Sequence, residues 1–264
     1  MIERVVVPVS FTSEAERALV VAPTLADWAG AGVELLSVVR PGDRLYVEPI
    51  VDTAARELGP RASFRIVESE GPVEAVLLTE LRQGSKELWC IGSHSRSALG
   101  ELILDGLSEE LVRQAHVPIV LVGPGAKSAP TGRVMVVALD GSEGSESSLG
   151  PAAELAAALG MTLRLLQVSS AIDGELPADT FESGYLAHMR HELTGVDPAT
   201  IDFDVLHGSH PAHDLAEYTA RQSDVGMIAL ATRGLIARQR LLHHSTTFDV
   251  AHHATVPVLA LHEV

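Results

Sequence analysis

Ile91–Val122 reads IGSHSRSALGELILDGLSEELVRQAHVPIVLV, and 139 residues further on Leu230–Leu261 reads LATRGLIARQRLLHHSTTFDVAHHATVPVLAL. Each stretch contains an apolar run, a turn of small residues, an irregular loop, a helix-forming segment and an apolar run opened by Val-Pro. Similarity that returns at a fixed spacing indicates a duplicated structural unit. We therefore expect two copies of one domain, at residues 1–123 and 133–264, joined by a Gly- and Pro-rich linker at residues 124–132.

The composition is typical of a folded globular chain, because 46% of the 264 residues are hydrophobic. No apolar run approaches the roughly 20 residues that cross a bilayer. The opening MIERVVVPVS lacks the basic and apolar regions of a signal peptide. Cys90 is the single cysteine, stands in the apolar segment ELWCIG, and has no partner for a disulfide within the chain. These features predict a cytoplasmic protein with no membrane contact and with a buried, unreactive Cys90.

The formal net charge of the chain is −16. Affinity for nucleic acid comes mainly from Lys and Arg that neutralise phosphates, so this charge argues against a nucleic-acid partner. It does not exclude a small anion held by backbone amides.

Apolar segments rich in Val, Ile and Leu alternate with amphipathic segments along both halves. Nearly continuous apolar strands that alternate with helices indicate a parallel sheet covered on both faces. The expected strands are residues 5–9, 35–39, 64–67, 88–91 and 119–122, then 133–139, 163–168, 201–206, 225–230 and 258–261. The expected helices are residues 13–29, 53–58, 72–83 and 107–115, then 145–159, 180–193, 211–222 and 246–253, with a polar loop at 41–48. We predict two doubly wound (Rossmann-like) α/β domains, each a five-stranded parallel sheet with strand order 3-2-1-4-5.

In such sheets, ligands bind beyond the carboxyl ends of the strands where the strand order reverses. That crevice lies between strands one and four of each half. Its candidates are Ser10 and Gly92 in the first half, and Asp140 and Ala231 in the second. Ser245, Thr246 and Thr247 stand where the last helix is expected to begin, and unpaired amides at a helix start favour an anion.

At these residues the chain resembles the universal stress protein family in its tandem two-domain form. The resemblance rests on the strand-one endings VVPVS and VVALDGS, on LLSVV and LLQVS, on the helix openings GP and HP, and on AHVPIVLV and ATVPVLAL. It covers essentially the whole chain, twice. It implies the fold argued above and, in the nucleotide-binding branch of the family, a site for ATP without a metal. It also implies that the two halves pair through their last strands as an intramolecular pseudo-dimer, and it leaves a further homodimer open.

The nucleotide-binding branch is similar in pattern to G-x2-G-x9-G-[S/T], with Asp at the end of strand one. In the second half, Asp140 stands at the acidic position that reaches the ribose or adenine. Ala231 and His244 replace the first and third glycines, whereas Gly234 keeps the second. The resemblance implies an adenine-nucleotide site lined by Ala138, Asp140, Val168, Ala231, Gly234, His244, Ser245, Thr246 and Thr247.

The first half departs further from this pattern. Ser10 replaces the acid, and only Gly92 of the three glycines is kept. Ser95 and Asp105 stand at the other two glycine positions, and Gly106 stands where the hydroxyl is expected. A carboxylate at Asp105 would repel phosphate. We therefore expect the first half to be a scaffold or to carry a different ligand.

Histidine is abundant, with 12 in the chain. His207, His210 and His213 cluster before Asp214, at the end of a predicted strand and the start of a helix. Zinc needs three or four converging ligands. The other interpretation, which we favour, is a set of solvated and partly helix-capping histidines, and we therefore predict no metal site here.

The leading hypothesis is a non-catalytic stress-response or signalling protein that binds an adenine nucleotide, ATP or AMP, in residues 133–264. The alternative is a tandem scaffold or protein-interaction module that has lost nucleotide binding in both halves. A metal-dependent ATPase or nucleotidyltransferase ranks third, since the sequence shows no nucleophile elbow and no group placed to position water.

Overall fold

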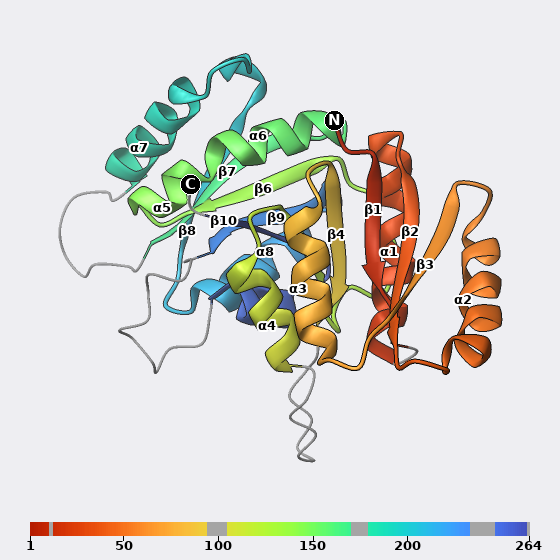
Figure 1. The fold of residues 1–264 in the computed structure, drawn as a ribbon. Coiled ribbons are helices and arrows are strands. Elements are labelled where there is room, and N and C mark those ends of the chain that lie inside the picture. Colours follow the sequence, from red (N-terminus) through yellow and green to blue (C-terminus); the bar gives the residue numbers. More distant parts are fainter. Residues whose placement is uncertain (11–12, 94–104, 170–178, 233–245, 263–264) are drawn as a thin grey trace.

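The computed structural model describes residues 1–10, 13–93, 105–169, 179–232 and 246–262 (Figure 1). Its strands match the ten that the sequence predicts, with small shifts at their ends. Their bounds are β1 (Arg4–Pro8), β2 (Gly32–Val39), β3 (Ala62–Glu68), β4 (Glu87–Gly92), β5 (Ile119–Val122), β6 (Val134–Leu139), β7 (Thr162–Ser169), β8 (Asp202–His207), β9 (Val225–Thr232) and β10 (Val258–His262).

The strands form one continuous sheet in the order β3-β2-β1-β4-β5-β10-β9-β6-β7-β8. Within each half the strands are parallel, and their order is the predicted 3-2-1-4-5. The halves meet where β5 pairs antiparallel with β10, with Val120 opposite Leu259. Pairing of the two halves through their last strands is therefore confirmed.

Helices cover both faces of this sheet (Figure 1). One face is packed by α1 (Ser13–Ala29), α2 (Arg44–Leu58), α5 (Glu143–Ser147), α6 (Leu149–Ala158) and α7 (Asp179–Glu192). The other is packed by α3 (Val73–Gln83), α4 (Asp105–Gln114), α8 (Pro211–Arg221) and α9 (Thr246–His253). Each face has its own apolar cluster, and each cluster continues across both halves. Among the described helices, none has both the length and the apolar character needed to span a bilayer.

The prediction of a polar loop at residues 41–48 is wrong, because α2 already begins at Arg44. Pro49 lies inside α2, and its missing amide leaves the Leu45 carbonyl without the usual helical partner. Apolar residues along one side of the helix contact the core and offset that loss. They are Val47, Val51, Ala54, Ala55 and Leu58.

The single helix predicted at residues 145–159 is instead two helices, α5 and α6, separated at Ser148. Pro151 lies in the first turn of α6, where its missing amide leaves the Ser147 carbonyl without the usual helical partner. The Ser148 hydroxyl donates to the Ser145 carbonyl at 2.7 Å, which ties the two helices together.

The segment that joins the halves packs closely against α9. Gly123 is buried, its Cα faces the carbonyl of Ala251, and Ala126 is 1% exposed in the apolar core. His262 stands 139 residues after Gly123, and its Nε2 contacts the carbonyl of Val112 in α4. Val112 and Ala251 are also 139 residues apart. The end of each last strand therefore touches the last helix of the opposite half.

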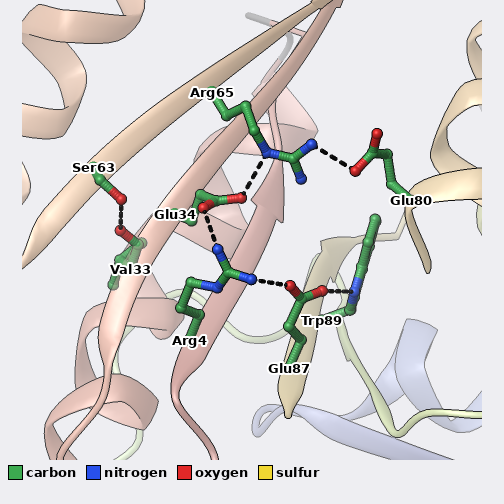
Figure 2. A network of polar contacts seen from close by, with 8 residues as sticks. All are labelled: Arg4, Val33, Glu34, Ser63, Arg65, Glu80, Glu87 and Trp89. Atoms are coloured by element: carbon green, nitrogen blue, oxygen red, sulfur yellow. Dashed lines mark hydrogen bonds and ion pairs between the residues drawn. The ribbon is translucent and has the colours of Figure 1, made fainter. Parts of the chain in front are cut away.

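A network of ion pairs crosses the first half, as Figure 2 shows. Glu34 in β2 is 7% exposed, and its two carboxylate oxygens accept from Arg4 at 3.0 Å and from Arg65 at 3.1 Å. Arg4 also binds Glu87 at 2.6 Å, and Arg65 binds Glu80 of α3 at 2.5 Å. The network thus links four strands and a helix.

The second half reverses the sign of this arrangement. Arg164 occupies the position of Glu34, 130 residues further on. It pairs with Asp224 at 2.8 Å and with Asp202 at 3.8 Å. The central group is therefore a cation held by carboxylates in the second half and a carboxylate held by guanidinium groups in the first.

Cys90 is fully buried in β4, as predicted, and burial raises the pKa of its thiol. The thiolate is the reactive form, so we expect the folded protein to resist modification by Ellman's reagent. Denaturation in guanidinium chloride should release the full reactivity of the thiol. Modification of the folded protein as fast as that of free cysteine would contradict this placement.

Candidate functional site

The crevice predicted for the second half would lie at the carboxyl ends of β6 and β9. These strands are parallel neighbours, with Val137 opposite Ala229. On the other side of β6, Ala138 pairs with Leu166 of β7. Strand order reverses at β6, so its carboxyl end is where this architecture leaves room for a ligand.

Asp140 follows β6 and is held by a tight turn. Its Oδ1 accepts from the Ser142 amide at 3.0 Å and from the Ser142 hydroxyl at 2.5 Å. Gly141 between them has φ 76°, a left-handed conformation that glycine adopts without strain. Ser142 then caps α5 by accepting from the Ser145 amide at 3.2 Å. The carboxylate is thus fixed on an exposed turn at the end of β6.

Three of the predicted site residues are apolar and stand near the ends of neighbouring strands. Ala138, Val168 and Ala231 are each half-buried at the carboxyl ends of β6, β7 and β9. Ala138 and Val168 pack against the apolar cluster under α8 and α9. The strand order brings their three strands together as neighbours.

The predicted anion seat is described only in part. α9 begins at Thr246, as predicted, with Thr246 exposed and the Thr247 side chain 3% exposed. Gly234, His244 and Ser245 lie outside the described residues. The start of a helix therefore stands in the predicted place, and the loop before it is not described.

The first half differs at the same place. Arg17 of α1 donates to the Ser93 carbonyl, just after β4, at 3.1 Å. Ser95 lies outside the described residues, and α4 begins at Asp105, the position that matches the third glycine. A cavity of about 680 Å³ opens beyond β1, β2 and β3, and Ser10 lines it.

Sequence reasoning did not single out two buried polar groups near Asp140. Among the described residues, the Tyr185 hydroxyl and Gln167 Oε1 are buried without a hydrogen bond of good geometry. Burial raises the pKa of Tyr185, and the nearby carboxylates of Glu146 and Asp140 add to this effect. Nothing in the local sequence marks either residue, because their surroundings arise from α5, α7 and β7 together.

His207, His210 and His213, which the structure describes, do not form a metal site. In the part of the chain that the structure describes, no three His, Cys, Asp or Glu side chains are arranged to hold a metal ion. His210 precedes α8, and its amide binds Asp214 at 3.0 Å. His213 instead meets His253 of α9, with ring centroids 6.0 Å apart.

Comparison with known proteins adds two findings. The model of the universal stress protein family matches residues 1–123 and 132–262. No protein with a curated description matches the sequence.

Three solved structures are similar along almost the whole chain. The first is a universal stress protein from Archaeoglobus fulgidus DSM 4304, with 16% identity, a TM-score of 0.66, and coverage of 99% of this chain and 98% of that one. The second is a candidate universal stress protein from Pseudomonas aeruginosa UCBPP-PA14, with 18% identity, a TM-score of 0.61, and coverage of 99% and 93%. A protein of unknown function from Pseudomonas aeruginosa PAO1 has 17% identity, a TM-score of 0.59 and the same coverage. At these identities the similarity establishes the fold.

Proposed function

The chain belongs to the universal stress protein family, and from this premise we propose that it is a non-catalytic stress-response or signalling protein that binds an adenine nucleotide in its second half. ATP and AMP are the proposed ligands, and no metal is needed to hold them. The proposed setting is the cytoplasm. Protein partners would respond to the occupied site, and association of two chains remains open.

The Asp140 turn is the observation that carries this proposal. The turn fixes Asp140 Oδ1 through two hydrogen bonds before any ligand arrives, so the carboxylate is preorganised. A carboxylate at this position can accept hydrogen bonds from ribose hydroxyls or from the adenine amino group. Its counterpart in the first half, Ser10, carries no charge.

The apolar residues beside Asp140 support the same ligand. Adenine presents a flat apolar face, and the half-buried Ala138, Val168 and Ala231 offer small side chains against which it can pack. Larger side chains at these positions would fill the space a base needs.

The start of α9 is the proposed phosphate position. The first amides of a helix have no partner within the helix and attract anions. Gly234, Ser245 and Thr247 are the proposed contacts in this region, with His244 in place of a glycine. Protonation of His244 would add a cation beside the phosphates.

Isothermal titration with ATP, ADP and AMP tests the proposal. Asp140→Ala is expected to weaken binding about tenfold, because a hydrogen bond to a charged group contributes roughly 1.5–3 kcal/mol. Asp140→Asn keeps an acceptor for Ser142 and should weaken binding without disturbing the turn. Ser10→Ala at the equivalent position of the first half is the matched control and should bind like the wild type.

Each alternative has its own outcome. Absence of binding heat for all three nucleotides at a protein concentration of about 100 µM would reject the proposal and favour a tandem scaffold. A loss of affinity in Ser10→Ala instead of Asp140→Ala would move the site to the first half. Metal-dependent turnover of ATP that Asp140→Ala abolishes would favour an enzyme.

A further inference from the structure

The first half contains a cavity with no assigned ligand. It lies beyond the carboxyl ends of β1, β2 and β3, and its sides include the first turns of α2 and α3. Its volume of about 680 Å³ is within the range of small-molecule sites. The cavity lies toward β2 and β3 from the end of β1, next to the residues where α2 and α3 begin.

Three charged side chains line this cavity without pairing. Arg40 follows β2, Asp43 precedes α2, and Glu70 follows β3. Among the described residues, no ion pair or side-chain hydrogen bond neutralises any of the three. Elsewhere in this half, Arg4, Arg44, Arg56, Arg61 and Arg65 each have a carboxylate partner. The cavity thus keeps charges of both signs available around one space.

A serine of a central strand also lines this space. Ser37 of β2 is 2% exposed, lines the cavity, and forms no side-chain hydrogen bond among the described residues. Because Ser37 lines the cavity, its hydroxyl can donate to or accept from a ligand atom there.

The remaining walls are largely aliphatic. Val9 and Val39 are buried, Val38 and Val47 are half-buried, and Val73 is 43% exposed at the start of α3. The cavity therefore combines apolar walls with one cation, two anions and the serines Ser10, Ser37 and Ser69.

We infer that this cavity is a binding site for a small zwitterion with an aliphatic body, the chemistry of an aliphatic α-amino acid. Arg40 pairs with the carboxylate, which can also accept from Ser37. Asp43 and Glu70 pair with the ammonium group, and the valines contact the aliphatic side chain. A simple anion would meet two carboxylates, and a simple cation would meet the guanidinium, so only a ligand with both charges suits all three groups. The inference does not depend on nucleotide binding in the second half.

Isothermal titration of the full chain with three matched probes tests this inference. L-leucine carries both charges, leucinamide lacks the carboxylate, and 4-methylpentanoate lacks the ammonium group. We expect leucine to bind at least about tenfold more tightly than either analogue, since each analogue leaves a charged group of the cavity unpaired.

Two variants assign the binding to the cavity. Arg40→Gln should weaken leucine about tenfold and remove its advantage over leucinamide, whereas the matched control Arg44→Gln, whose side chain pairs with Glu48, should bind as the wild type does. Ser37→Ala should weaken leucine about threefold without lowering stability. Asp140→Asn should leave leucine binding unchanged, which separates this site from the proposed nucleotide site.

Several results would overturn the inference. One is the absence of leucine binding at about 10 mM, which is the weak limit for a small metabolite. The others are equal affinity for the three probes and full leucine affinity in Arg40→Gln. Displacement of leucine by AMP would make the cavity a nucleotide site instead.

Discussion

Gly123→Ala is expected to lower the free energy of unfolding by about 3 kcal/mol, the upper end of the usual range for overpacking. A Cβ added at Gly123 would lie 1.7 Å from the carbonyl oxygen of Ala251 and 2.7 Å from its carbonyl carbon. Both are backbone atoms of α9, so neither can rotate away as a side chain would. Relief requires α9 to move from the strand end that it covers, at the junction of the two halves. Urea unfolding followed by circular dichroism measures the change.

Gly184→Ala is the matched control. Gly184 lies inside α7, and an added Cβ there meets no atom within 4 Å. This change should raise the free energy of unfolding by roughly 0.5–1 kcal/mol, because alanine favours the helix over glycine. Equal stability of the two variants would show that the close approach of Gly123 to α9 is absent in solution.

The sheet could be predicted because its strands are short apolar runs with clear ends. Pro118 cannot donate to a strand ladder, and β5 begins at the next residue, as predicted. β2 begins at Gly32, three residues before its predicted start. Glu34 interrupts the apolar pattern, so the local sequence does not indicate this earlier start. The carboxylate is accommodated by Arg4 and Arg65 from neighbouring strands, and such long-range partners are not visible in a local stretch of sequence.

Of the two candidate sites, one could be predicted from local sequence and the other could not. The position of Asp140 could be predicted from the sequence because it follows a clearly apolar strand and precedes a Gly-Ser turn. The cavity of the first half could not, because Ser37, Asp43 and Glu70 come from three segments that only the strand order and the path of α2 bring together. The prediction of a loop at residues 41–48 also hid the helix that forms one of its sides.

Glu34→Ala is expected to lower the free energy of unfolding by about 2 kcal/mol, less than the 3–5 kcal/mol typical of breaking a fully buried ion pair. The Glu34 side chain is 9% exposed, whereas those of Arg4 and Arg65 are 49% and 38% exposed. After the change, Arg4 keeps Glu87 and Arg65 keeps Glu80, so neither guanidinium is left alone (Figure 2). The loss therefore comes from two charge-assisted hydrogen bonds and from the space that the side chain vacates.

Urea unfolding of Glu34→Ala beside Glu217→Ala measures this effect. Glu217 pairs with Arg221 on the surface of α8, with side chains 49% and 72% exposed, and its removal should leave stability within the error of the wild type. The loss in Glu34→Ala should persist at high salt, because ions screen a buried pair much less than an exposed one. A loss that disappears as salt is added would mean that the carboxylate is solvated, and that the link between β1, β2 and β3 contributes little. If the pair is intact, Arg65→Ala should lower the free energy of unfolding less in the Glu34→Ala background than in the wild type, since the two residues share one interaction.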